Sequence, residues 1–167
     1  MATITKSDMK WVLNYAGTSP DTIELDEGAS QTFVKGELVF YSAGSIIEIA
    51  SDTPALIYGM AAADGHNAAV NTKKIPVYVV NENLLFEGNV LAASLADYVL
   101  AQGDLGTPMA IQRDTTNSRV FLDSGTKAGT NTRVFVHRVA AGSAIGDTNG
   151  RVLFSFIPKF AQSITSS

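Results

Sequence analysis

The sequence predicts a mainly β protein, built as a small β-barrel or as a sandwich-like, β-tulip architecture, with one short helix and an extended N-terminal arm. Short apolar runs rich in Val, Ile and Phe recur between residues 32 and 158, and clusters of Gly, Asn, Asp and Ser separate them. Only residues 91–100 have apolar spacing typical of a helix. Many short strands with little helix indicate a barrel or a sandwich.

Composition narrows the class of protein. The chain has 167 residues, 46% of them hydrophobic and 17% charged, which is typical of a folded chain rather than a disordered one. Its formal charge of −4 lacks the basic excess of nucleic-acid-binding proteins, and its scattered Lys and Arg form no polybasic membrane patch. The absence of cysteine excludes disulfides and thiolate chemistry. We therefore expect neither a nucleic-acid nor a membrane partner.

The N-terminal fifth of the chain, residues 1–31, is expected to be an arm and a loop. After ten mostly polar residues, Trp11, Leu13 and Tyr15 form the first apolar group, which predicts a mobile arm with an aromatic anchor. The polar start also lacks the apolar core of a secretory signal. Residues 17–30 are acidic and rich in turn residues, so they predict a surface loop with a short strand at 22–25.

The first strong strand signal is a hairpin over residues 35–50. Two apolar runs flank the turn sequence SAGS, and Glu48 between two isoleucines gives the alternation of a half-buried strand. A further strand is expected at 55–60, where Gly59 indicates a bulge or a close backbone approach. The main β-rich domain is assigned to residues 32–160 and a flexible tail to 161–167.

The pattern continues with a second predicted hairpin, formed by residues 75–80 and 84–90. A short helix is expected at 91–100, where Leu91, Leu95 and Val99 recur every four residues. The remaining strands are expected at 108–113, 118–123, 132–139 and 150–158. Whether the chain forms one barrel or two β subdomains divided near 88–104 stays open at this stage.

No catalytic, cofactor-binding or metal-binding residues are predicted. His66 lies in a turn and His137 in a strand, with no metal-ligand spacing between them. The DTNG sequence at 147–150 is better explained as a turn than as a calcium loop, because an apolar strand follows it at once. The acidic residues between 21 and 27 are expected to form a solvated loop face. We therefore expect a binding or structural protein rather than an enzyme.

One resemblance goes further than the composition. VKGELVFYSAGSIIEIA followed by ALIYGMAAADG resembles the opening of the capsid decoration, or cement, proteins of tailed phages. The matching positions are Gly36, Glu37, Val39, Ile57, Gly59, Met60, Ala61 and Asp64. The segment at 75–90 looks like the next hairpin of that pattern, and residues 132–158 look like its closing strands. The similarity covers about residues 32–158.

The resemblance implies a homotrimer on the outer surface of a mature phage capsid, made in the host cytoplasm. It would bridge neighbouring major capsid proteins and stabilise the shell against DNA pressure, without a cofactor. Trp11, Leu13 and Tyr15 would then contact the capsid or another subunit, since aromatic residues dominate interface energies. Deleting residues 1–16 should weaken capsid binding and leave the fold intact. The alternatives are a head fibre base or tail protein, and a ligand-binding β-barrel.

Overall fold

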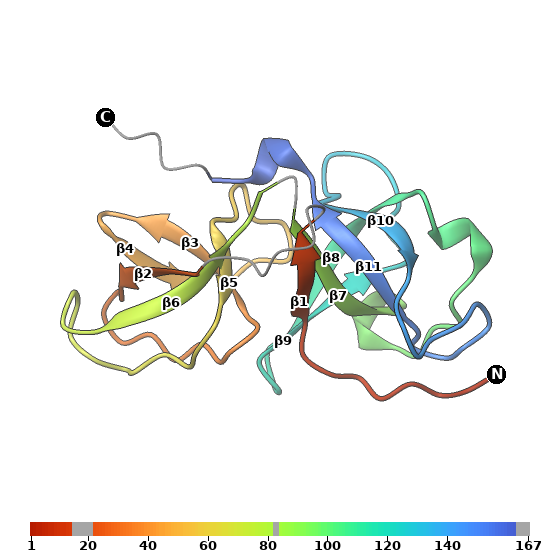
Figure 1. The fold of residues 1–167 in the computed structure, drawn as a ribbon, viewed down its shortest axis with the longest axis horizontal. Coiled ribbons are helices and arrows are strands. Elements are labelled where there is room, and N and C mark those ends of the chain that lie inside the picture. The colour runs from red at the N-terminus through yellow and green to blue at the C-terminus, as the bar shows by residue number, and fades with distance from the viewer. Residues whose placement is uncertain (15–21, 82–83, 163–167) are drawn as a thin grey trace.

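A computed structural model describes residues 1–14, 22–81 and 84–162, with the backbone alone described at 11–14. It is mainly β, as the sequence predicts, and contains a closed barrel beside a separate sheet (Figure 1). The strands are β1 (Lys10–Asn14), β2 (Thr22–Asp26), β3 (Leu38–Ser42), β4 (Ser45–Glu48), β5 (Gly59–Ala61), β6 (Lys74–Val79), β7 (Leu84–Leu91), β8 (Pro108–Asp114), β9 (Arg119–Asp123), β10 (Val134–Val139) and β11 (Arg151–Phe156).

The barrel is built from β7, β11, β10, β8 and β9, with β1 added at its edge. It closes because β7 also pairs with β9 in parallel, through Val90 opposite Leu122 and Leu91 opposite Asp123. All residues of β7 are buried, since this strand pairs with β1, β11 and β9. Phe86, Phe154 and Phe156 pack against one another inside the barrel, which is therefore filled by side chains.

The second sheet has the strand order β2-β6-β5-β3-β4. Its β3–β4 hairpin confirms the predicted one, and its turn residues Ala43 and Gly44 have φ values of 49° and 87°. Gly59 confirms the close backbone approach, because a Cβ atom there would lie 2.5 Å from the carbonyl oxygen of Tyr78. Strand 22–25 is confirmed as β2.

Two sequence-based predictions are wrong. Strands β6 and β7 form no hairpin, because β6 pairs with β2 and β5 while β7 belongs to the barrel. The chain therefore crosses from one sheet to the other between them. The helix at 91–100 is also absent: that segment holds the end of β7 and the short 3₁₀ turn η1 (Ala93–Leu95).

The apolar spacing at 91–100 does not form one face. Leu91 is buried at the end of β7, Leu95 has a φ of 63°, and Val99 is 51% exposed. These three apolar residues lie in different environments and not on one face of a helix. Their recurrence every four residues therefore does not indicate a helix here. Two other 3₁₀ turns, η2 (Gln102–Asp104) and η3 (Pro158–Phe160), complete the elements.

The two sheets share one hydrophobic core. Leu38 and Met60 of the five-stranded sheet, together with Ile57 just before β5, belong to the same buried cluster as the barrel phenylalanines. The opposite face of that sheet buries a second cluster, made of Phe33, Val39, Ile46, Tyr58, Ala61, Ile75 and Val77. Alternation along β3 explains this, since successive side chains of a strand point to opposite faces.

Candidate interaction surface

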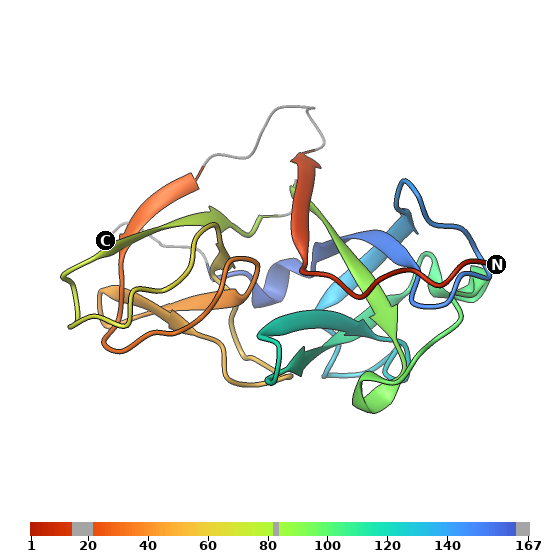
Figure 2. The same cartoon turned by 90° about the horizontal axis from the view of Figure 1, so that it is seen from below.

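Two of the three predicted contact residues, Trp11 and Leu13, lie on the edge strand β1. Trp11 is opposite Phe86 and Leu13 is opposite Leu85, with a register shift between the two pairs. Tyr15 lies outside the described residues, and the side chains at 11–14 are not described. The structure thus places the backbone of Trp11 and Leu13 at the rim of the barrel sheet (Figure 2).

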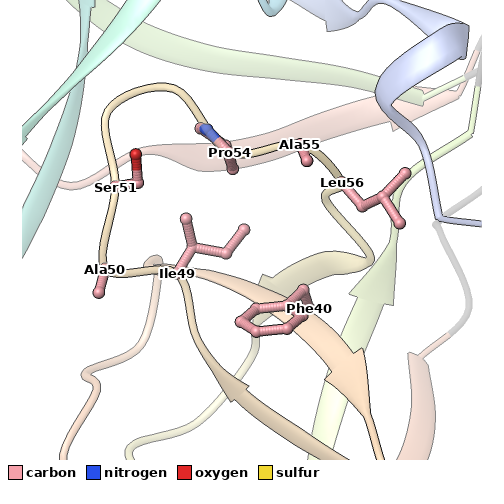
Figure 3. Close-up of a pocket in the computed structure, with 7 residues that line it drawn as sticks. All are labelled: Phe40, Ile49, Ala50, Ser51, Pro54, Ala55 and Leu56. Atoms are coloured by element: carbon pink, nitrogen blue, oxygen red, sulfur yellow. The ribbon is translucent and has the colours of Figure 1, made fainter.

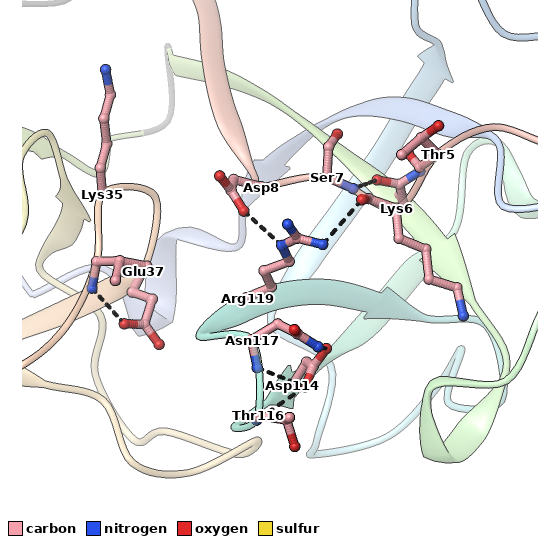
Figure 4. A network of polar contacts seen from close by, with 12 residues as sticks. Thr5, Lys6, Ser7, Asp8, Lys35, Glu37, Asp114, Thr116, Asn117 and Arg119 are labelled. Carbon is pink, nitrogen blue, oxygen red and sulfur yellow. Dashed lines mark hydrogen bonds and ion pairs between the residues drawn. The ribbon is translucent and has the colours of Figure 1, made fainter.

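Residues 1–9 are not a free arm, which corrects the expectation of a mobile segment. Arg119 of β9 donates to the Asp8 carboxylate at 2.9 Å and to the Lys6 carbonyl at 3.2 Å (Figure 4). The side chain of Asn89 bonds the Thr5 carbonyl and the Ser7 amide. Met9 is 2% exposed and joins the main core. The segment is extended, but it lies against the barrel along its length.

The first residues are fixed by an acidic loop residue that sequence analysis assigned to a turn. The Asp147 carboxylate accepts the backbone N–H groups of Ala2 and Ala144, at 2.7 and 2.8 Å. These bonds lower the pKa of Asp147 below its usual value. Asn149 has a φ of 57°, which confirms a turn at this sequence.

A buried ion pair lies beneath the start of β1. Arg151 Nε of β11 is 2.5 Å from the Glu87 carboxylate of β7, and both side chains are almost fully buried. The guanidinium also donates to the carbonyls of Asp8 and Glu87 and to the side chain of Asn89. This network connects the N-terminal segment with two barrel strands, so β1 is supported by buried polar contacts as well as by its pairing with β7.

A second ionic cluster joins the barrel to the five-stranded sheet. Arg113 of β8 lies against the carboxylates of Glu48 and Glu37, and its backbone N–H donates to Asp52 at 2.7 Å. Arg133 donates to the Pro54 carbonyl at 2.6 Å. Glu37 before β3, Glu48 of β4, and Asp52 and Pro54 of the following loop are thereby bound to Arg113 at the end of β8 and Arg133 just before β10.

Burial changes the pKa of one carboxyl group in this cluster, that of Glu37. Glu37 is 3% exposed, and burial is the main cause that raises the pKa of its carboxyl group. The nearby Glu48 carboxylate raises the pKa further, while the bond from the Val34 N–H and the charge of Arg113 act in the opposite direction. The ionised form of Glu37 is therefore less favourable in the folded protein than in the unfolded chain.

We expect this pKa shift to be visible in stability. Because the pKa of Glu37 is raised in the folded protein, its contribution to the free energy of unfolding is greatest at low pH. This contribution decreases as the pH rises from the ordinary pKa of 4.5 through the pKa in the folded protein. Glu37→Gln removes this loss, so the variant should gain stability relative to the parent between about pH 4 and about pH 7. Urea unfolding across that range measures the difference, with the exposed Glu24→Gln as the control. A constant difference between parent and variant would contradict the assignment.

The last described residues form another connection between the two parts. Ile57 N–H donates to the Phe160 carbonyl, and Gln162 N–H donates to the Ile57 carbonyl. The Gln162 side chain bonds both the N–H and the carbonyl of Tyr41. The tail predicted to be flexible is therefore bound at its first two residues; residues 163–167 lie outside the described residues.

An apolar pocket of about 360 Å³ opens at this junction. Figure 3 shows Phe40 and Ile49 from the hairpin side facing Pro54 and Leu56 from the loop between β4 and β5. Because Arg113 and Arg133 fix this loop through Asp52 and Pro54, the pocket is part of the folded structure. The pocket could not be predicted from the sequence, because its lining comes from two segments with no shared pattern.

The two histidines have different partners in the structure. His66 Nδ1 is 2.7 Å from the carboxylate of Glu27, which is 1% exposed and so is not part of a solvated acidic face. His137 Nε2 is 2.9 Å from Ser155 Oγ, and burial lowers the pKa of this histidine. Among residues 1–14, 22–81 and 84–162, no group of three or more acidic or histidine side chains is placed to hold a metal ion.

No helix within the described ranges is long and apolar enough to span a membrane. In comparisons with known proteins, no family model, curated protein or solved structure matches the chain. The candidate surface is therefore defined by geometry alone: the strand edge at β1, the polar contacts beneath it, and the apolar pocket at the junction.

Proposed function

We propose that the chain is a structural virion protein that binds the outer surface of a mature phage capsid and bridges neighbouring major capsid proteins. The main support is the fixed junction between its two parts, made by Arg113, Arg133 and a shared core. A bridging protein must transmit force between two contact points, and a rigid body loses less entropy on binding than a flexible one.

The residues behind the family resemblance support the same proposal. Most of them occupy the turn before β3, β3 itself, and β5, which pair in one sheet, while Ile57 precedes β5 and Asp64 follows it. Gly36 has a φ of 95°, which favours glycine, and Gly59 approaches the backbone of Tyr78 too closely for a side chain. The backbone therefore requires glycine at both positions. The proposal includes a homotrimer, because linked copies would multiply weak capsid contacts. The site of action would be the outer capsid surface, with synthesis in the host cytoplasm.

The test is the copy number of the chain in purified particles, measured by quantitative mass spectrometry against the most abundant shell protein. We expect a ratio near one to one, with the chain released before the shell protein under mild denaturation. A few copies per particle would instead favour a head fibre base or a tail protein. Absence from the particle would contradict every virion role.

The apolar pocket favours a second candidate, a protein that binds small apolar molecules. Its volume of about 360 Å³ is within the range of ligand pockets, and apolar groups form most of its lining. The barrel interior is no rival site, because its phenylalanines fill it. A series of small aromatic and aliphatic compounds should then raise the unfolding temperature, and Ala55→Trp, which fills the pocket, should abolish that increase.

A further inference from the structure

Two strand edges remain open in the part of the chain that the structure describes. Strand β1 pairs only with β7. Residues 22–26 of β2 pair only with β6, and the next residue, Glu27, forms an isolated bridge with Ile46 of β4, so the free edge of β2 lies toward its N-terminal end. The remaining edge strand, β4, is covered: Ile46 accepts the Gly28 N–H, and the Glu48 N–H donates to Gln31. Open edges present unpaired N–H and C=O groups and readily add a strand from another chain.

The start of β1 has an excess of positive charge. A hollow of about 380 Å³ lies there, lined by Ser7, Asp8, Met9, Lys10, Lys35 and Arg151. Asp8 is paired with Arg119, and Arg151 with Glu87. Lys10 is exposed and shares Glu87 with Arg151, while Lys35 is exposed and forms no ion pair with any described residue. The two lysines therefore remain available to an acidic partner.

The edge of β2 has the opposite character. Glu24 is exposed and is in no ion pair among the described residues, and Asp26 is bound only to an exposed lysine, Lys74. Ile23, which lies between Thr22 and Glu24, is an apolar side chain that is 46% exposed at this edge. Such an edge lacks the lysine or proline that usually protects an unpaired strand.

We propose that β1 of one copy binds β2 of a second copy as an added strand. The charges favour a second copy as the occupant, because Lys10 of β1 and Lys35 line the hollow at one edge, while Glu24 lies at the other edge of the same chain. Within one chain the two strands belong to different sheets and lie apart (Figures 1 and 2), so they do not satisfy each other. Each strand has five residues, so the pairing is short and involves the N-terminal part of β2, away from the bridge between Glu27 and Ile46.

This contact uses different surfaces on the two copies. A head-to-tail contact repeats from copy to copy, and it produces a closed ring where the rotation allows closure. The inference does not depend on the proposed capsid role, since a chain absent from particles would still associate in this way. The two ideas therefore succeed or fail in separate experiments.

The test is the mass of the full chain in solution, measured by sedimentation over a range of concentration and salt. We expect association that weakens as salt is added. Lys10→Glu/Lys35→Glu, and separately Glu24→Lys, should each weaken it by roughly tenfold or more. The combined variant with all three changes should recover association, because it restores opposite charges at the two edges. Arg138→Glu/Lys159→Glu, which changes two exposed charges elsewhere, should associate like the parent.

Hydrogen exchange locates the contact independently of charge. The backbone amides of residues 10–14 and 22–26 should exchange more slowly in the associated form than in the diluted monomer. A chain that stays monomeric at low salt would overturn the proposal. So would an associated form that protects other segments, a triple variant that fails to recover, or a control pair that dissociates equally.

Discussion

Removing residues 1–9 is expected to lower the free energy of unfolding by about 4 to 8 kcal/mol. The largest part is Met9, which is 2% exposed and packs in the main core, because emptying such a site costs about 2 to 5 kcal/mol. The rest comes from Asn89, which is fully buried and would lose both Thr5 and Ser7. A loss of this size approaches the whole stability of a small domain.

Urea unfolding of the truncated chain measures this loss. Met9→Ala should show the core part alone, and Met9→Leu, which conserves volume, should cost less than about 1.5 kcal/mol. An unchanged unfolding midpoint after truncation would mean that the segment does not lie against the barrel. The structure thus leads to the opposite of the sequence-based expectation for deleting residues 1–16. Interface tests therefore need point substitutions at exposed residues such as Lys10 rather than a deletion.

The second large effect is expected at Arg151. Arg151→Met leaves the Glu87 carboxylate buried with only the exposed Lys10 as a partner, and breaking a buried ion pair from one side costs about 3 to 5 kcal/mol. Adding Glu87→Leu should recover most of this loss, since an apolar pair of similar volume is often as stable as the ion pair.

The matched control is Lys10→Met, which removes the exposed partner of the same carboxylate and should cost at most about 1 kcal/mol. Thermal unfolding of the four proteins provides the comparison. If Arg151→Met is no more harmful than Lys10→Met, the guanidinium does not hold the network beneath β1. If the double variant is as unstable as the single one, the cost lies in packing rather than in an unpaired charge.

The strands were predictable because their signal is local. The hairpin at 35–50 and the strands of the C-terminal third each carry their own apolar alternation and turn residues, and the structure contains them. The barrel-type fold class followed from their number and spacing. The prediction of a helix at 91–100 was wrong because it rested on only three recurring apolar residues. Such a short pattern cannot reveal that Ser94 and Leu95 have positive φ values.

Less of the candidate interaction surface could be predicted from the sequence. Trp11 and Leu13 were predicted as contact residues of an arm, whereas the structure places them in the edge strand β1; their role in binding remains a prediction. The sequence only weakly indicates the ion pairs of three buried acidic residues, which lie beside apolar strand runs or in loops: Glu37, Glu87 and Glu27. Their partners Arg113, Arg151 and His66 lie 39 to 76 positions away, a separation that no local pattern can bridge.

By itself, the sequence determined that this protein is mainly β, where most of its strands lie, and that cysteine chemistry has no part in it. The pairing of these strands was decided only by the tertiary structure: β6 and β7 are neighbours in sequence but belong to different sheets, and β7 closes the barrel against β9. The physical reason is that alternation fixes which side of a strand is buried, not against which strand. Burial of Met9, the ionic junction at Arg113 and the two open edges all follow from that choice of partners.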